Sequence, residues 1–564
     1  MPLAKFALRN LLLAAALGFA LTRAIGLFWC SDDAFISFRY AENLNAGLGL
    51  VFNAGERVEG FTNFSWTMLV AGAMRLGADP VVFAQWAGLA CFLATIGLLA
   101  WASRRIAGPT APFLPVAAVG LALHEHAAVF ASGGLETSLF TLLTTATVVG
   151  AVAARGNRGL FWAGTLGVLA AMTRPDGMLP YGIAGLVGLQ RAIAARRLAP
   201  FLAVVAPGLL FFAPYFAWRW SYYGWPFPNT FYAKSAASPY PQQGLYYVSL
   251  YFGCYFVLGL GALGAVFAAL LSPLRGGPSE PGRLPTRALA LAIAGTVAIY
   301  VAFVTWVGGD FMFGRFLVPI TPLLYLGLEL PRARWPDRAF GAILMVLAAG
   351  LTLARAYPHA ELLPPSGRRG VVEERLNYTP QTTAAMRQAG FILRENFAGQ
   401  DSRVVILGAQ AVLAYYGGFT LAIEGCTGLT DEHIAHLPIA ARHSVGHEKS
   451  IVALDPEYLE RRRVQFSLHL DPAMYLRDHW RHIAFGPVYG VIVTWDRAMM
   501  RHLRTRPDVT FLDFERVLDD WIAGMPHRSD AEVRAQYAEW KRFYFDHNDD
   551  PAHEAPFLAR LGPR

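Results

Sequence analysis

The sequence has little charge and few cysteines for its length. Only 16% of its 564 residues are charged, while 55% are hydrophobic. This composition leaves too little polar surface for an ordinary globular enzyme, so a lipid bilayer is the expected solvent. Four cysteines exclude a disulfide scaffold. Cys91 and Cys254 lie in apolar runs, so only Cys30 and Cys426 could both face an oxidising compartment and pair there.

A basic tract, a cleavable leader and an internal repeat are also missing. The net charge of +8 comes largely from arginines in short clusters between apolar runs, so no nucleic-acid partner is expected. Bulky Leu27, Phe28 and Trp29 precede Cys30, so we expect an uncleaved first span rather than a signal peptide. No repeat relates two halves of the apolar region, which weakens a transporter interpretation.

The apolar runs predict a membrane domain over residues 1–357. A spanning helix needs about 20 apolar residues, and cytoplasmic loops are enriched in Lys and Arg. Together these rules predict about eleven spans, a cytoplasmic N-terminus and an external tail. The stretch 64–76 is expected as an interfacial helix, because crossing there would invert the arginine loops. The expected spans are 7–29, 81–102, 110–131, 135–154, 158–173, 177–190, 199–220, 245–271, 288–306, 316–331 and 339–357.

Residues 358–564 predict a small external α/β domain. Strands are expected at 403–407, 419–423 and 489–494, with a helix at 409–415. The segment 428–433 either reaches back over the membrane site or is a packed loop in which Asp431 is a cap. Trp521, Trp540, Tyr544 and Phe545 either stack on an acceptor glycan or, as we favour, pack in the core.

With this topology, the segments richest in unusual polar residues all fall on the external face. Charged groups near a bilayer cost several kcal/mol unless they are paired or wet, so their convergence predicts a cavity at the outer interface. The six segments are 31–35, 56–60, 133–136, 174–177, 229–234 and 308–315.

The first external loop, residues 30–63, carries the candidate catalytic group. Asp32 and Asp33 are adjacent and precede an amphipathic stretch. Asp is a favoured helix cap, which is the alternative interpretation. Two adjacent carboxylates exceed what a cap requires, so one of them is expected to act as a general base on an acceptor hydroxyl. We favour Asp33 over Asp32.

Three external cations could stabilise a phosphate leaving group: Lys234, Arg174 and Arg315. Alternatively, the two arginines are snorkelling anchors at span ends and Lys234 is a solvated loop residue.

The external carboxylates Asp310, Glu136, Glu59 and Asp176 complete the predicted binding set. Asp310 could instead be only a salt-bridge partner of Arg315, Glu136 could complement a helix dipole, and Glu59 could be an exposed loop residue.

The histidines do not predict a metal site. The run 124–126 (His-Glu-His) lies near the outer end of an apolar span, where we favour a wet or interfacial position over metal binding. The tail residues His433, His436, His443 and His447 match no standard zinc spacing.

Several of these segments also resemble a known pattern. They are Asp32 to Tyr40, Gly49 to Asn53, Gly55 to Gly60, Thr62-Asn63, Thr173 to Gly177 and Gly308 to Asp310. Together they resemble the GT-C glycosyltransferases, and among them the family of the mycobacterial terminal β-(1→2)-arabinofuranosyltransferase and its bacterial relatives. The likeness covers most of residues 1–330.

The resemblance implies a GT-C-type bundle of transmembrane helices with external juxtamembrane helices and an acidic catalytic motif in the first external loop. It also implies a bacterial inner-membrane location, with the site on the periplasmic side. The expected activity is transfer of a sugar, such as arabinofuranose, from a polyprenyl-phosphate donor to a glycan or lipid acceptor with inversion. The loop has no Asp-x-Asp ligand set, so no cofactor is expected and a divalent metal is not favoured. The alternative function is a transporter or flippase of lipid-linked saccharides.

Overall fold

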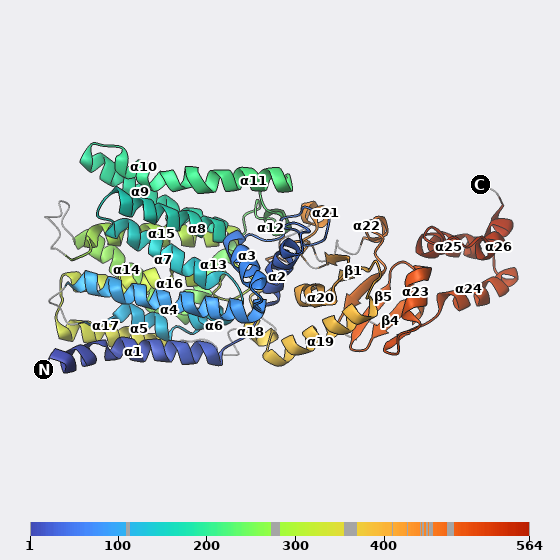
Figure 1. Ribbon diagram of the computed structural model, residues 1–564, viewed down its shortest axis with the longest axis horizontal. Coiled ribbons are helices and arrows are strands. Elements are labelled where there is room, and N and C mark those ends of the chain that lie inside the picture. Colours follow the sequence, from blue (N-terminus) through green and yellow to red (C-terminus); the bar gives the residue numbers. More distant parts are fainter. Residues whose placement is uncertain are drawn as a thin grey trace.

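The structure is a computed structural model, and it has an elongated shape with a helical bundle at one end and a mixed region of helices and strands at the other (Figure 1). The N-terminus lies at the far end of the bundle, and the C-terminus lies at the opposite extreme. The residues that the structure describes are 2–108, 113–271, 282–354, 369–408, 410–425, 427–439, 442, 445–446, 449, 455–470 and 479–562.

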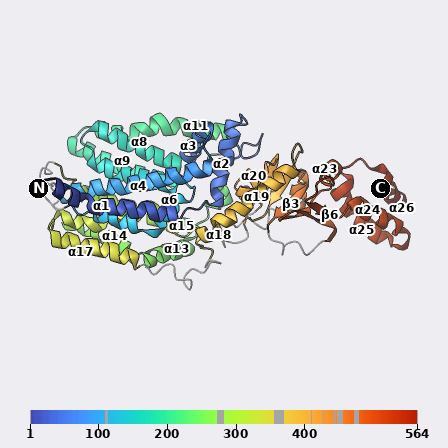
Figure 2. The ribbon, with the colours of Figure 1, turned by 60° about the horizontal axis from the view of Figure 1, so that its bottom comes forward.

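Long apolar helices run side by side along the length of the bundle (Figures 1 and 2). They correspond to the apolar runs of the sequence, and an apolar helix buries a stripe of its surface against its neighbours. Their bounds are α1 Pro2–Gly26, α4 Pro80–Ala107, α7 Thr137–Ala153, α8 Asn157–Thr173, α9 Met178–Ala195, α10 Ala199–Pro207, α11 Ala213–Tyr223, α15 Thr286–Val307, α16 Thr321–Glu329 and α17 Arg338–Leu353.

Some expected spans are broken rather than continuous. The span expected at 110–131 is split at His124 into α5 (Val116–Leu123) and α6 (Glu125–Ser132). Helices α6 and α7 then bend by 119° at the intervening glycines, and α13 (Pro241–Cys254) bends by 96° into α14 (Phe256–Leu271).

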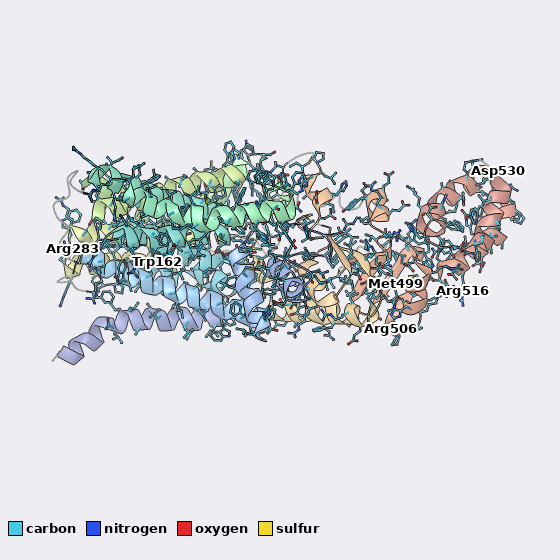
Figure 3. The ribbon with its side chains drawn as sticks, turned by 45° about the horizontal axis from the view of Figure 1, so that its top comes forward. Trp162, Arg283, Met499, Arg506, Arg516 and Asp530 are labelled. Atoms are coloured by element: carbon cyan, nitrogen blue, oxygen red, sulfur yellow. The ribbon has the colours of Figure 1, made fainter. Side chains whose placement is uncertain are left out.

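By length and apolar composition, four of the described helices could cross a membrane, or up to six if each bent pair is one span. The total of about eleven spans stays a prediction. The arginine-rich end is the one expected to face the cytoplasm, and Figure 3 places Arg283 there, at the end of the bundle remote from Asp530.

Three short helices lie at the end of the bundle that meets the C-terminal region. They are α2 (Asp32–Asn45), α3 (Phe64–Arg75) and α12 (Asn229–Ala233). Helix α3 corresponds to the interfacial helix expected at 64–76, and α2 to the amphipathic stretch after the Asp pair. These helices therefore bring the loop 30–63 against the C-terminal region.

The C-terminal region is built around a six-stranded sheet with the order β2-β1-β3-β5-β4-β6. Strands β2, β1 and β3 are parallel, and the remaining pairings are antiparallel. The apolar run expected as a buried strand is β1, and the strands expected at 419–423 and 489–494 are β2 and β5, each displaced by one or two residues. The bounds are β1 Arg403–Ile406, β2 Leu421–Glu424, β3 Phe466–His469, β4 His482–Phe485, β5 Val488–Ile492 and β6 Val509–Phe511.

Helices flank this sheet, and further helices follow its last strand up to the C-terminus. The distal ones enclose an aromatic core in which Trp540, Tyr544 and Phe545 are buried and Trp521 stacks on Phe557 at 5.2 Å, in agreement with the favoured core-packing interpretation. The bounds are α18 Glu374–Asn377, α19 Pro380–Asn396, α20 Gln410–Gly417, α21 Glu432–His436, α22 Pro456–Arg461, α23 Arg497–Leu503, α24 Phe514–Ala523, α25 Asp530–Trp540 and α26 Pro551–Leu561.

Three smaller expectations can be compared with the structure. The expected boundary at 357/358 lies outside the described residues, as does Cys426, while Cys30 is a free, buried thiol. The wet or interfacial position expected for the run 124–126 is wrong for its two histidines. His124 and His126 are buried inside the bundle, and His126 Nε2 lies 2.9 Å from a carboxylate oxygen of Glu373.

Candidate functional site

A cavity of about 540 Å³ lies where the outer end of the bundle meets the C-terminal region. Segments far apart in the sequence meet there, including α2, the bend between α6 and α7, the turn before α9, α12 and the glycine-rich loop after α15. Of the predicted site residues, those that line it are Asp33, Glu136, Arg174, Asp176, Lys234, Asp310 and Arg315. The structure therefore brings these loops together around one cavity, as expected.

Asp33 faces the cavity from the first turn of α2. Residues three and four positions apart share a helix face, and Ile36 and Ser37 line the cavity beside it. Arg315 Nη1 donates a hydrogen bond to Asp33 Oδ2 at 3.2 Å. The Asp33 side chain keeps 26% of its surface exposed, against 4% for Glu136 and 1% for Asp310, so it is the carboxylate of this cluster that a ligand reaches most easily.

Arg315 joins the carboxylates of the cavity. Besides Asp33, its guanidinium lies 3.6 Å from Glu136 and 3.6 Å from Asp310. Glycine is needed in this loop: Gly309 has a φ of 76°, and a Cβ there would lie 2.5 Å from the ring of Tyr247. Arg315 is thus held by several acids at once, whereas the snorkelling alternative would leave it in solvent.

Arg174 is the second buried guanidinium. It donates two hydrogen bonds to the carboxylate of Asp176, at 3.0 and 2.9 Å, and lies 3.8 Å from Glu136. The rings of Phe140 and Phe316 lie 4.9 and 4.7 Å from its guanidinium carbon. Arg174 is therefore fixed in place by its partners and does not extend to an interface.

Glu136 lies between these two arginines at the bend before α7. Its carboxylate also accepts a hydrogen bond from Asn63 Nδ2 at 3.1 Å, and it makes no cap bond to its own helix. Its electrostatic partners are thus the two guanidinium groups, so it does more than complement the dipole of α7.

Lys234 differs from the arginines because it has no ion-pair partner among the described residues. It follows α12, is half-buried and lines the cavity. An uncompensated ammonium group beside a cavity is a natural contact for an anion.

Asp32 points away from the cavity, which corrects the prediction that it shares the catalytic role. Its carboxylate accepts hydrogen bonds from the backbone N–H groups of Ala411 and Val412, at 3.2 and 3.0 Å, in the first turn of α20. Burial raises the pKa of Asp32 to about 7, opposed by these hydrogen bonds. The capping alternative, in which the Asp pair caps its own helix, is not observed: α2 has no side-chain cap, and Asp32 instead accepts from the first turn of α20.

Glu59 does not line the cavity either, so its predicted binding role is corrected. It is buried and ion-paired with Arg219 of α11, with Nη2 2.5 Å from Oε2 and Nε 3.0 Å from Oε1. Its backbone oxygen accepts a hydrogen bond from Asn229 N at 3.0 Å. Glu59 therefore ties the loop 30–63 to α11 and α12.

Sequence reasoning missed several polar residues at the site. Tyr300 donates a short hydrogen bond to Asp176 from the middle of a run that looked wholly apolar. Glu374 of α18 does not line the cavity, but burial and then the charges of Asp33 and Asp32 raise its pKa to about 8. Asn63 was visible only as part of the Thr-Asn motif. Among the described residues, no three His, Cys, Asp or Glu side chains are grouped so as to hold a metal ion.

Comparisons with known proteins agree with the resemblance seen in the sequence, although no protein-family model matches. The chain is 32% identical over 372 residues to the terminal β-(1→2)-arabinofuranosyltransferase of Mycobacterium tuberculosis, covering 58% of this chain and 57% of that protein. It is 32% identical over 344 residues to the protein of the same name from Corynebacterium glutamicum, covering 53% and 48%. The chain spans about half the length of the curated relatives it matches. These matches confirm the resemblance to the arabinofuranosyltransferases.

Two solved structures share the fold. ArnT from Cupriavidus metallidurans bound to undecaprenyl phosphate aligns with a TM-score of 0.53 at 14% identity, covering 86% of this chain and 97% of that one. Its apo form aligns with a TM-score of 0.54 at 14% identity, covering 87% and 98%. The chain therefore shares the fold of ArnT.

Proposed function

We propose that this protein is an inverting glycosyltransferase that transfers a sugar, such as arabinofuranose, from a polyprenyl-phosphate donor to an extracytoplasmic glycan or lipid acceptor. The observation that carries the proposal is the pairing of Asp33 with Arg315 in a cavity that also holds Lys234. A base, an anion site and an apolar wall are the three elements that this reaction needs.

Asp33 acts as the general base. It takes the proton of the acceptor hydroxyl as that oxygen attacks the anomeric carbon. The bond between that carbon and the phosphate oxygen breaks, and its electron pair leaves with the polyprenyl phosphate. One displacement inverts the anomeric carbon, and the proton ends on Asp33.

Arg315 and Lys234 stabilise the charge that develops on the leaving phosphate. Fixed cations act most strongly where water is excluded, because they need no reorganisation during the reaction. Glu136 and Asp176 orient the two guanidinium groups, and Asp310 keeps one buried carboxylate oxygen without a hydrogen-bond partner, which suits a sugar hydroxyl.

The lipid part of the donor follows the apolar wall of the cavity. Phe303 and Trp306 of α15 line it, together with Phe231 of α12. Trp306 is 57% exposed, so this wall continues from the cavity to the surface of the bundle, where we place the bilayer. The ArnT structure that contains undecaprenyl phosphate supports a polyprenyl-phosphate donor.

No metal is needed in this mechanism, because the cations of the chain face the phosphate. We therefore expect EDTA to leave the transfer rate within about twofold of the untreated rate, since the charge stabilisation comes from Arg315 and Lys234. Loss of activity with EDTA and its recovery with Mg²⁺ would instead assign the phosphate to a metal.

We place the cavity and residues 358–564 on the periplasmic side of a bacterial inner membrane, with 1–357 as the membrane domain. A cysteine at Gly156, an exposed position with no atom near its Cβ, should be shielded from an impermeant maleimide in intact spheroplasts. A cysteine at Ser529 should be labelled. Labelling at 156 from outside would overturn this orientation.

The deciding experiment is mass spectrometry of lipid-linked sugars in a strain that lacks the protein. The donor should accumulate, which identifies the sugar, and wild-type protein should clear it whereas Asp33→Asn should not. If the Asp32→Asn, Asp33→Asn double variant clears the donor as fast as wild type, the catalytic interpretation is wrong and the transporter alternative replaces it.

A further inference from the structure

A loop of the C-terminal region forms part of the cavity wall. Leu429 lines the cavity, although almost all other lining residues lie before position 317 in the chain. Helix α21, which follows this loop, packs beside α12 (Figure 1). The C-terminal region therefore contributes directly to the candidate site.

Its own residues give this loop, 427–431, a defined shape. The carboxylate of Glu424, at the end of β2, accepts hydrogen bonds from Thr427 N at 2.8 Å and Leu429 N at 3.1 Å. Gly428 has a φ of 70°, and a Cβ there would lie 2.5 Å from Ile434. The loop is thus built to present Leu429 in one position.

The membrane domain holds the other side of the same loop. Asn229 Nδ2 lies within hydrogen-bond distance of three carbonyl oxygens, those of Gly428, Leu429 and Asp431, at 3.1, 2.8 and 3.1 Å. At Gly60 a Cβ would lie only 2.8 Å from the carbonyl oxygen of Leu429. Two segments that the sequence marked as unusual, 56–60 and 229–234, therefore seat this loop.

We propose that loop 427–431 forms the acceptor subsite, in which Leu429 contacts the acceptor saccharide and Asn229 is a positioning residue; this rests on the proposed function. The donor's lipid must stay in the bilayer, beside α15, whereas a glycan acceptor approaches from the water side. The loop belongs to the region that extends away from the bundle on that side (Figure 2). An apolar side chain there packs on the C–H face of a sugar ring.

The test is the partition of sugar between a saccharide acceptor and water, measured with purified full-length protein and a polyprenyl-phosphate sugar. Leu429→Trp fills the acceptor subsite, and Asn229→Asp sets a carboxylate against three carbonyl oxygens. Each should lower the ratio of saccharide product to free sugar by about tenfold, the scale of a changed apolar contact in a substrate pocket. Leu429→Met, similar in volume, should keep the ratio within about twofold.

Asn53→Ala is the matched control. Asn53 also holds the C-terminal region, exchanging hydrogen bonds with the backbone of Ala422 at 3.0 and 3.1 Å, but it does not line the cavity. Its partition ratio should equal that of wild type even if its unfolding temperature falls.

Each outcome decides the proposal. If both products fall in parallel in Leu429→Trp, so that the ratio is unchanged, the loop serves the fold or the donor and the proposal is wrong. If Asn229→Asp fails to fold, Leu429→Trp decides alone. Failure of the proposed function looks different, because wild-type protein would then release sugar to neither saccharide nor water.

Discussion

The two polar faces of α2 are built differently. On one face, Asp33 meets Arg315 at 3.2 Å in the cavity. On the other, Asp32 accepts two backbone hydrogen bonds from the start of α20, and Arg39 donates to backbone oxygens near its end, including that of Phe419 at 3.0 Å. An acid at the N-terminus of a helix and an arginine near its C-terminus both match the helix dipole.

The two faces also differ in what their charged side chains contact. Buried atoms without hydrogen-bond partners include Asp310 Oδ2, Arg174 Nη1 and Arg315 Nε, all at the cavity. On the other face of α2, the polar groups of Asp32 and Arg39 bind backbone groups of the C-terminal region. We call this the docking face. A buried polar group without a hydrogen bond costs free energy, and a ligand that forms that hydrogen bond would recover it. Under the proposed function, the cavity face therefore serves chemistry, whereas the docking face joins α2 to the C-terminal region.

The largest effect is expected at Asp33. Asp33→Asn keeps the shape but cannot accept the proton, so transfer should fall by about 10² to 10⁴ with little change in unfolding temperature. The measurement is the turnover of a radiolabelled polyprenyl-phosphate sugar. Equal losses in Asp33→Asn and Asp32→Asn would erase the distinction between the two faces.

The next effect is expected at Arg315. Arg315→Ala should lower turnover by about 10² to 10³, the scale for loss of one preorganised donor to a developing charge. Arg462→Ala is the matched control, since Arg462 pairs with Glu56 at 2.5 Å and Asp431 at 3.1 Å on the docking side. Arg462→Ala should lower the unfolding temperature more than it lowers turnover. A larger effect on turnover would contradict the distinction between the cavity and docking faces.

Much of the cavity face could be predicted from the sequence. The arginine loops and apolar runs predict which loops share one face of the membrane, and rare charged residues at such a face are expected to meet at a cavity. That logic placed Asp33, Glu136 and Arg315 together across hundreds of residues. This prediction needs only the apolar runs and the arginine clusters, which can be read from short stretches of the sequence.

The docking face could not be predicted in the same way. Asp32 and Asp33 are adjacent, but about 100° separates neighbours on a helix, so they face different surroundings. Asp32 turns to α20, whose Ala411 lies 379 positions further along the chain, and this leaves Asp33 at the cavity. Glu59 likewise found Arg219 at a separation of 160 residues. The break at His124 also escaped prediction, because hydropathy does not distinguish a broken apolar helix from a continuous one.

Lys234 sharpens the comparison because it is a cavity cation without a carboxylate partner among the described residues. Lys234→Ala should raise the KM for the donor about tenfold, the scale of one hydrogen bond to a charged group, while changing kcat less. Lys234→Arg should restore most of the affinity. An unchanged KM in Lys234→Ala would remove this residue from the phosphate site.

The smallest effect on transfer, and the sharpest test of the docking face, is expected at Asp32. Burial raises the pKa of Asp32 from 3.8 to about 7, so the folded protein binds this proton more tightly than the unfolded chain does. The contribution of Asp32 to stability is therefore fully present below pH 3.8 and is lost as the pH rises to about 7. Asp32→Asn cannot titrate. The unfolding temperature of wild type relative to this variant should fall by about 2 °C or more across that window and stay level above it. Turnover of the variant should stay within about threefold of wild type, because a group outside the cavity handles no substrate proton. A relative unfolding temperature that rises with pH would mean that the ionised carboxylate is the form that α20 binds best, and that the hydrogen bonds of Ala411 and Val412 outweigh burial.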